Sequence, residues 1–286
     1  MEIKTCGVVG AGTMGNGIAQ VATQVGGLNV IMNDIGDEFV ERGLGVITKN
    51  LDRLMSKERL TAAQKDDILG RIKKSTNIED MKDADFVVEA ATEKVDLKLS
   101  IFQDLDRICK PGIILATNTS SIPITKIAAA TKRPELVIGM HFFNPVPVMK
   151  AVEIISGLAT SKDTVDTTCK LAERFGKTSV EANDSPAFIV NRMLVPMINE
   201  AVYLLYEGVG TVENIDNMMK LGLNHPMGPL ELADLIGLDV CLHVMEVLYS
   251  GFSDSKYRPC PLLRKYVDAG YLGRKTGRGF YYYRQK

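Results

Sequence analysis

The feature that most constrains this chain is a glycine-rich turn, Gly10-Ala11-Gly12-Thr13-Met14-Gly15, which follows a strand-like run and precedes an apolar helical stretch. Gly10 permits the tight turn, Gly12 lets the backbone approach a pyrophosphate, and Gly15 lets the helix pack closely on the strand. A helix that begins near Gly12 directs its free N–H groups and partial positive charge at the phosphates. All six residues of the turn are therefore predicted to bind a dinucleotide.

Asp34 indicates which dinucleotide is preferred. It ends the second apolar run, 28–32, and a carboxylate there accepts hydrogen bonds from both ribose hydroxyls. The same carboxylate repels a 2′-phosphate, and residues 35–38 supply no arginine to receive one. NAD is therefore predicted over NADP. The alternative is that Arg42 or Lys49 reaches the ribose and contacts a 2′-phosphate there.

Composition excludes several classes of protein. The chain has 286 residues, 45% of them hydrophobic, which is enough for one large or two modest domains. With 34 basic and 35 acidic residues, nothing indicates a nucleic-acid or anionic-membrane surface. Its five cysteines are scattered without a C-x-x-C spacing, which favours free thiols over a zinc site or any other metal. No apolar run has membrane-spanning length, and the first strand leaves no room for a signal peptide. We expect a cytoplasmic protein without a membrane or nucleic-acid partner.

The first part of the chain alternates strand-like and helical stretches. This rhythm predicts an α/β domain of the Rossmann type, with a mainly parallel, doubly wound sheet. The expected strands are 3–9, 28–33, 85–90, 113–117, 137–143 and 149–155. Residues 37–70 depart from the rhythm and predict an inserted helical hairpin, with Thr61 as the N-cap of its second helix. Two solvated helices covering one face of the sheet are the alternative.

The character of the sequence changes at Ser185-Pro186, a pair that suits the N-cap and first turn of a helix. We therefore place a boundary between a domain of residues 1–185 and an all-helical domain of residues 186–286. Helices are expected at 186–207, 212–221, 229–249 and 259–269. The first of these has a long apolar face, which favours a homodimer. Packing of that face only within the chain is the alternative.

His141 is the strongest acid–base candidate among the three histidines. It lies at the carboxyl end of a strand, which is the edge where open α/β sheets bind ligands. The next strand follows too soon for a crossover helix, so the two strands are expected to be antiparallel, and a turn centred on Pro147 pairs His141 with Glu153. Glu153 is the only charged residue in the apolar run 151–155, and a buried carboxylate needs a partner. Such a pair fixes the tautomer and leaves the other ring nitrogen for proton exchange. A structural histidine that anchors the turn is the alternative.

Two roles fit each of the next polar candidates. Residues 118–121 follow another strand at the same edge, where they suit either a ligand oxygen or the cap of the next helix. Asn191 stands among apolar residues of the first helix of the second domain, where it suits either a bond between the domains or a ligand. His225 fits a helix-capping loop, and His243 fits a packing or surface position on a helix.

These motifs together resemble the short-chain L-3-hydroxyacyl-CoA dehydrogenases, over the whole chain and most closely their bacterial 3-hydroxybutyryl-CoA members. The resemblance is carried by the glycine turn, Asp34 and several further runs: Asn118-Thr119-Ser120-Ser121, His141-Phe142-Phe143-Asn144-Pro145, Asn191-Arg192, His225-Pro226-Met227-Gly228-Pro229 and Lys275-Thr276-Gly277-Arg278-Gly279-Phe280-Tyr281. It implies an NAD domain with a helical hairpin and a helical domain that dimerises.

The resemblance also implies roles for single residues. His141 is the general base that removes the hydroxyl proton of a 3-hydroxyacyl-CoA while C3 passes hydride to NAD, and Glu153 orients it. Ser120 and Asn191 bind substrate oxygens, with Ser120 also near the nicotinamide ribose. The positions that match cofactor-binding residues of the family are Glu93, Lys98, Asn118, Asn144 and Lys275.

The hairpin gains a function from the same resemblance, because similar enzymes hold the CoA phosphates there. Arg53 and Lys57 occupy the matching helix face, and arginine stands where bacterial relatives often have lysine. Three other functions remain open. They are oxidation of a free hydroxy acid or sugar acid, hydrolysis by a Ser120–His141–Glu153 triad without a G-x-S-x-G elbow, and NAD binding without catalysis.

Overall fold

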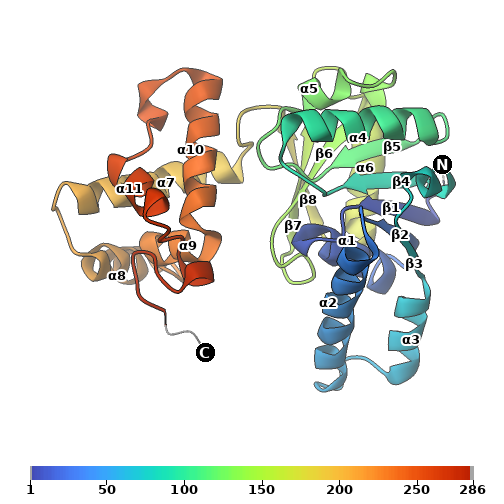
Figure 1. Ribbon diagram of the computed structural model, residues 1–286, viewed down its shortest axis with the longest axis horizontal. Helices are drawn as coiled ribbons and strands as arrows, with labels where there is room; N and C mark the ends of the chain where they lie inside the picture. The colour runs from blue at the N-terminus through green and yellow to red at the C-terminus, as the bar shows by residue number, and fades with distance from the viewer. Residues whose placement is uncertain (1, 284–286) are drawn as a thin grey trace. The chain divides into compact units, whose positions relative to one another are not determined.

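A computed structural model describes residues 2–283 of the chain. The chain divides into two compact units, Met1–Ser185 and Pro186–Lys286, each of which has its own hydrophobic core. Figure 1 shows the elements of both units along the chain. Each unit is described separately below.

The first unit is built on an eight-stranded sheet with the order β3-β2-β1-β4-β5-β6-β7-β8. Every neighbouring pair is parallel except β6 and β7, which are antiparallel. The strands are β1 Thr5–Val9, β2 Asn29–Asn33, β3 Ile72–Ser75, β4 Phe86–Glu89, β5 Ile114–Thr117, β6 Val137–Phe142, β7 Ala151–Ser156 and β8 Thr178–Asn183. The predicted Rossmann-like, mainly parallel sheet is confirmed. The two edge strands, β3 and β8, are additions that the sequence did not predict.

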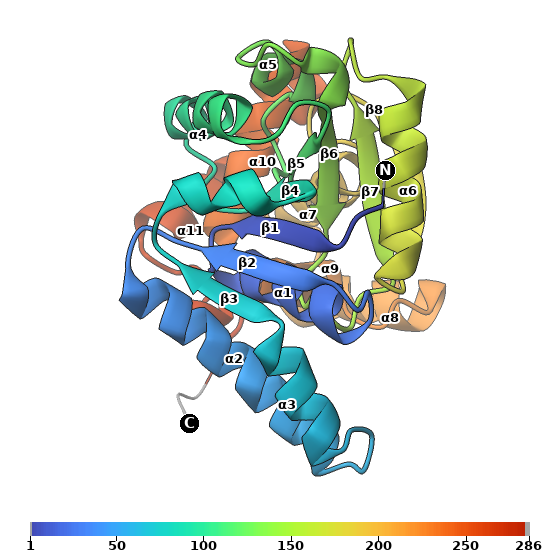
Figure 2. The same ribbon diagram turned by 90° about the vertical axis from the view of Figure 1, so that its right-hand side faces the viewer.

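Helices cover both faces of this sheet. They are α1 Thr13–Gln24, α2 Asp37–Met55, α3 Ala62–Gly70, α4 Val95–Ile108, α5 Ile124–Ala128 and α6 Lys162–Arg174, with 3-10 turns η1 Ile78–Asp83 and η2 Pro134–Leu136. Figure 2 shows α4 and α5 on one face and α1 and α6 on the other. Right-handed crossovers place α1 and the pair α4 and α5 on opposite faces, because the chain moves outward from β1 in opposite directions. The α6 crossover falls on the same face as α1, because β7 and β8 run antiparallel to β6. With both faces covered, β4 and β5 are buried throughout their length.

The segment between β2 and β3 forms the predicted helical hairpin, and Figures 1 and 2 show α2 and α3 side by side and extending beyond the sheet. Thr61 caps α3 through a capping box with Gln64, as predicted. One detail was wrong, because Lys57 lies in the turn after α2 rather than on its face. The helix ends there since Glu58 adopts a left-handed φ of 56° and the Arg59 N–H bonds back to the Leu54 carbonyl.

The second unit is helical throughout its regular structure. Its helices are α7 Val190–Tyr206, α8 Val212–Leu223, α9 Pro229–Ile236, α10 Leu238–Phe252 and α11 Pro261–Asp268, with 3-10 turns η3 Ser255–Tyr257 and η4 Arg274–Thr276. The single helix predicted over 229–249 is wrong, because Gly237 takes a φ of 108° and separates α9 from α10. The predicted cap at Ser185-Pro186 is also wrong. Positive φ angles at Ala187 and Phe188 form a turn there, so α7 begins only at Val190.

None of the helices in residues 2–283 combines the length and the hydropathy that a membrane-crossing segment needs.

Candidate active site

The glycine turn has the shape that a dinucleotide requires. Gly10 adopts a φ of 99°, and a Cβ on Gly15 would lie 1.7 Å from the Gly10 carbonyl oxygen. A Cβ on Gly12, in contrast, would meet no atom within 4 Å, so this side of the turn faces open space. Gly12 is the N-cap of α1, and neither a capping side chain nor an acidic residue occupies the first turn of that helix. The helix N-terminus therefore fits the pyrophosphate of NAD.

Asp34 stands beside this turn at the end of β2. Its Oδ2 accepts a hydrogen bond from the Ala11 N–H at 2.7 Å, and its Oδ1 accepts one from the Ile35 N–H at 2.8 Å. A carboxylate has about four acceptor positions, so capacity for ribose hydroxyls remains. The guanidinium of Arg42, the alternative group for a ribose phosphate, lies 5.0 Å from the centre of the Phe39 ring.

A pocket of about 210 Å³ opens next to the glycine turn, where β4 and β5 end. It is lined by Met14, Ala90, Ala91, Thr92, Glu93, Lys98 and Asn118. Four of the predicted cofactor residues (Met14, Glu93, Lys98 and Asn118) therefore come together at one place.

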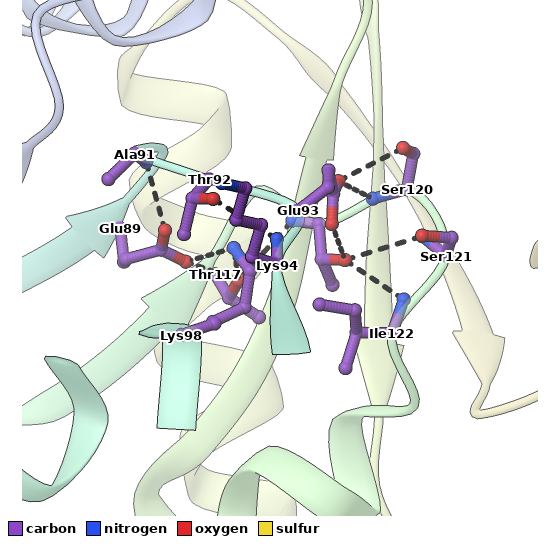
Figure 3. Close-up of polar contacts among 11 residues, drawn as sticks. Glu89, Ala91, Thr92, Glu93, Lys94, Lys98, Thr117, Ser120, Ser121 and Ile122 are labelled. Atoms are coloured by element: carbon purple, nitrogen blue, oxygen red, sulfur yellow. Dashed lines mark hydrogen bonds and ion pairs between the residues drawn. The ribbon is translucent and has the colours of Figure 1, made fainter. Parts of the chain in front are cut away.

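Glu93 also connects this pocket to the loop after β5, as Figure 3 shows. Its Oε1 accepts hydrogen bonds from the backbone N–H and the hydroxyl of Ser120, at 2.8 and 3.1 Å. Its Oε2 accepts one from the Thr119 hydroxyl at 2.8 Å. The structure gives residues 118–121 no capping role, because α5 has Pro123 as its N-cap and the Thr125 N–H in its first turn donates to Asp184 Oδ2 at 2.8 Å instead.

Lys98 occupies an unexpected position for a cofactor-binding lysine. Its side chain is only 1% exposed, and the ammonium bonds to the carboxylate of Glu89 and to the hydroxyl of Thr117. Neither Glu89 nor Thr117 was predicted from the sequence to be a site residue. The signal was available for Glu89, which is an acid that ends an otherwise apolar strand run, just as Glu153 interrupts another.

His141 and Glu153 face each other across the antiparallel pair β6 and β7, so the predicted register is confirmed. His141 Nδ1 lies 2.7 Å from Glu153 Oε2, and both residues are buried. An ionised carboxylate only accepts hydrogen bonds, so Nδ1 carries the proton and Nε2 is the basic nitrogen. Asn118 Oδ1 accepts a hydrogen bond from the Phe142 N–H at 2.9 Å, which ties the end of β6 to the pocket.

The turn that joins β6 to β7 carries Asn144. Lys177, which the sequence analysis also missed, donates hydrogen bonds to the carbonyl oxygens of Val146 at 2.5 Å and Met149 at 2.7 Å. Burial lowers the pKa of this lysine. Lys177 therefore fixes the turn that aligns the histidine strand with the glutamate strand.

The remaining predicted site residues belong to the hairpin and to the second unit. Arg53 and Lys57 are exposed on the hairpin. Asn191 lies in the first turn of α7, in the second unit, and is half-buried. Lys275 belongs to the same unit and bonds to both carboxylate oxygens of Asp239, at 2.6 and 2.7 Å.

The other two histidines, His225 and His243, lie in the second unit. The backbone N–H of His225 bonds to the Met219 carbonyl oxygen and so closes the end of α8, next to Asn224 at a φ of 56°. His243 is exposed on α10.

Comparison with known proteins agrees with this geometry. Residues 5–185 match the NAD-binding domain of the 3-hydroxyacyl-CoA dehydrogenases, and residues 188–283 match the C-terminal domain of the same family. A probable 3-hydroxybutyryl-CoA dehydrogenase from Bacillus subtilis is 58% identical over 286 residues, which cover 100% of this chain and 99% of the relative. A 3-hydroxybutyryl-CoA dehydrogenase from Bradyrhizobium diazoefficiens is 55% identical over 99% of this chain and 96% of the relative.

A solved structure gives the same result. The crystal structure of (S)-3-hydroxybutyryl-CoA dehydrogenase PaaH1 from Ralstonia eutropha superposes with a TM-score of 0.96 at 56% identity, covering 99% of this chain and 100% of the other. The chain therefore belongs to the 3-hydroxyacyl-CoA dehydrogenase family, and its first unit is an NAD-binding domain.

Proposed function

We propose that this protein interconverts (S)-3-hydroxybutyryl-CoA and acetoacetyl-CoA, with NAD as the hydride acceptor and NADH as the donor. One observation carries the proposal: a buried histidine–glutamate pair with a 2.7 Å contact lies on the sheet whose glycine turn fits NAD. The relatives named 3-hydroxybutyryl-CoA dehydrogenase supply the substrate.

His141 acts as the general acid–base group in this proposal. In the oxidative direction, Nε2 removes the proton of the C3 hydroxyl, and in the reductive direction it returns that proton to the alkoxide oxygen. Glu153 accepts the Nδ1–H, holds the ring in one tautomer and stabilises the charge that the ring gains. The cofactor supplies the hydride acceptor, so no metal is needed for the step.

The other side chains bind and orient the reactants. We propose that Ser120 and Asn191 hold substrate oxygens, with Ser120 fixed for this task by its bonds to Glu93. The cofactor is held by the glycine turn and Asp34, together with the polar residues that the family resemblance assigns to it: Glu93, Lys98, Asn118, Asn144 and Lys275.

The exposed basic residues of the hairpin, Arg53 and Lys57, are proposed to bind the CoA phosphates. The test is the NADH oxidation rate with acetoacetyl-CoA and with free acetoacetate. Acetoacetyl-CoA should be reduced far faster, and Arg53→Ala plus Lys57→Ala should raise its KM about tenfold through the loss of two charge-assisted contacts.

Matched control variants are Arg107→Ala and Lys162→Ala, which remove exposed basic side chains from α4 and α6. A KM unchanged by the hairpin variants, or equal rates with the free acid, would favour the oxidation of a free hydroxy acid. Release of free CoA without NADH would favour hydrolysis.

We further propose a division of labour between domains 1–185 and 186–286, in which the second completes the substrate site and forms a homodimer. An apolar groove of about 440 Å³ on the second unit supports dimerisation, because monomers rarely expose such surfaces. Its lining includes Met197, Leu204, Val209 and Met218. Sedimentation of the protein as a monomer at micromolar concentration would contradict this proposal.

A cytoplasmic location is proposed on the state of the cysteines. All five are free thiols, which suits a reducing compartment. Burial raises the pKa of Cys6 to about 12 and that of Cys109 to about 11, so these thiols stay protonated and unreactive.

A further inference from the structure

A buried ion pair lies directly beside the proposed cofactor pocket. Glu89, at the end of β4, is 0% exposed, and Lys98, on α4, is 1% exposed. Glu89 was not among the predicted site residues. Burying two charges costs several kcal/mol per ion before their attraction is counted, so a pair of this kind needs a reason to be kept.

Glu89 receives donors from several elements at once, as Figure 3 shows. Its Oε1 accepts a hydrogen bond from the Ala91 N–H at 2.9 Å, and its Oε2 accepts one from the Thr117 hydroxyl at 2.8 Å and another from Lys98. Lys98 also donates to the Thr117 hydroxyl oxygen at 3.3 Å. One carboxylate thus joins β4, β5, α4 and the loop that follows β4.

The contacts of Glu89 reach two parts of the cofactor site. Ala90 and Ala91 back the glycine turn, because a Cβ on Gly10 would lie 2.6 Å from Ala91 Cα and 2.7 Å from the Ala90 carbonyl oxygen. Lys98 lines the pocket itself, together with Glu93, which holds Ser120. Glu89 therefore fixes the backbone behind the turn and also neutralises the ammonium beside the pocket.

We propose that Glu89 is a positioning and charge-balancing residue for the cofactor. It holds Lys98 and the Ala90-Ala91 segment in place, and it offsets the positive charge of Lys98 near the nicotinamide end of the site. The inference rests on the proposed placement of Ser120 near that end, because Glu93, which bonds to Ser120, lines the same pocket as Lys98. Oxidised nicotinamide is a cation and reduced nicotinamide is neutral, so an unbalanced ammonium disfavours NAD⁺ more than NADH.

The test is equilibrium titration of Glu89→Gln with NAD⁺ and with NADH, in the absence of any acyl-CoA. The glutamine keeps an acceptor of the same shape but removes the charge. We expect NAD⁺ affinity to fall about tenfold and NADH affinity only about threefold, so that the ratio of the two dissociation constants changes. A role in folding alone would weaken both equally, and an unchanged ratio would overturn the inference.

Two further variants keep the test decisive if Glu89→Gln folds poorly. Lys98→Met leaves the carboxylate unbalanced and should shift the ratio in the opposite direction, towards NAD⁺. The double variant Glu89→Gln plus Lys98→Met removes both charges and should restore the ratio to within about twofold of the wild type. A shift in the same direction for both single variants would overturn the inference.

Asp106→Asn is the matched control, because Asp106 lies on the same helix and forms a largely buried ion pair with Arg133 at 2.7 Å. This variant should lower the melting temperature and leave the ratio unchanged. An equal shift in the control would contradict a specific role for Glu89. Since these titrations contain no thioester, failure of acetoacetyl-CoA reduction would leave their outcome unaffected, and the two proposals can fail separately.

Discussion

The two units both bury carboxylates but surround them differently. In the first unit, Glu89 and Glu153 each face a basic side chain. Glu89 pairs with Lys98 beside the pocket, and Glu153 faces His141 near the carboxyl end of β6. In the second unit, Asp216 and Asp234 are also almost fully buried, yet the donors that they bind are backbone N–H groups and tyrosine hydroxyls.

The aspartates of the second unit fix residues 280–283 and the start of α9. Asp234, on α9, accepts hydrogen bonds from the N–H groups of Phe280 and Tyr281 and from the Tyr283 hydroxyl. Asp216, on α8, accepts bonds from two N–H groups at the start of α9. A Cβ on Gly279 would lie 1.9 Å from Asp234 Oδ1, so the segment approaches as closely as glycine allows.

Under the function proposed above, this contrast separates carboxylates that prepare chemistry from carboxylates that fix the fold. An acid that faces a titratable base at a ligand-binding edge stabilises a charge that changes during a reaction. An acid that accepts hydrogen bonds only from neutral donors takes the place of water around backbone N–H groups and holds chain segments together. Loss of the first kind should therefore lower activity, and loss of the second kind should lower stability.

The largest expected effect belongs to His141→Gln, which removes the proposed base while filling a similar volume. The rate of acetoacetyl-CoA reduction should fall about 10³-fold, because general acid–base catalysis contributes about 10²–10⁴. NADH affinity should change by less than about twofold. Steady-state kinetics and NADH titration on the same preparation check both parts. Turnover near the wild-type rate would show that His141 is not the general base, and the two kinds of buried carboxylate would then not differ in function.

Asp234→Ala should show the converse behaviour. It leaves two buried N–H groups and a hydroxyl without their acceptor, so the free energy of unfolding of the second unit should fall by about 3 kcal/mol. Denaturant unfolding checks this, with the partly buried Glu231→Ala on the same helix as the control, since its side chain bonds to Arg274 on the surface. NADH affinity should stay the same, and a large loss of affinity with intact stability would break the comparison.

Asp234 also makes the free energy of unfolding depend on pH. Burial raises the pKa of Asp234, so its carboxyl binds a proton more readily in the folded state than in the unfolded state. Between the ordinary value and the raised one, this group makes stability fall as the pH rises. Asp234→Ala should remove that slope from the pH dependence of unfolding.

Asp34→Ala tests the rule that an acid bound only by neutral donors serves the fold alone. The Asp34 carboxylate also receives backbone N–H groups, but it is only half-buried and lies beside the glycine turn. Asp34→Ala should weaken NADH binding about tenfold, which corresponds to two lost ribose contacts at about 0.7 kcal/mol each. It should also reduce the preference over NADPH. Unchanged affinities for both cofactors would place Asp34 with the structural acids.

The smallest expected effect is that of Thr61→Ala at the N-cap of α3. Loss of the capping box should destabilise the protein by about 1 kcal/mol, measured by denaturant unfolding, with the KM for acetoacetyl-CoA changed by less than about twofold. Thr61→Ala thus shows how large the effect on stability is when a polar group with only a structural role is lost from the first unit. A large rise in KM would show that α3 helps to shape the substrate site.

Much of the first unit follows from local sequence rules. The glycine turn and Asp34 predict their own surroundings, and the short connection around Pro147 fixes the register that pairs His141 with Glu153. The edge strands β3 and β8 were not predicted, because their side chains are largely polar and exposed and the alternation that marks a buried strand is missing.

The other errors arise from tertiary structure that overrides local preference. Ser185-Pro186 has the chemistry of a helix start, yet the chain turns through left-handed conformations at Ala187 and Phe188 first. The apolar pattern of α9 and α10 is continuous, and only the backbone of Gly237 shows that the helix is broken. Glu89 ends an apolar strand run in the sequence, but its partner Lys98 lies on the following helix, and only the structure brings the two together.

Hydride transfer to C3 is traced by reducing acetoacetyl-CoA with NADH that carries deuterium at the transferable C4 position, and by locating the label in the product. We expect 3-hydroxybutyryl-CoA with one deuterium at C3 from the wild-type protein, and about 10³-fold slower formation of the same product by His141→Gln. Product without deuterium at C3, or free CoA in place of the alcohol, would contradict the proposed function.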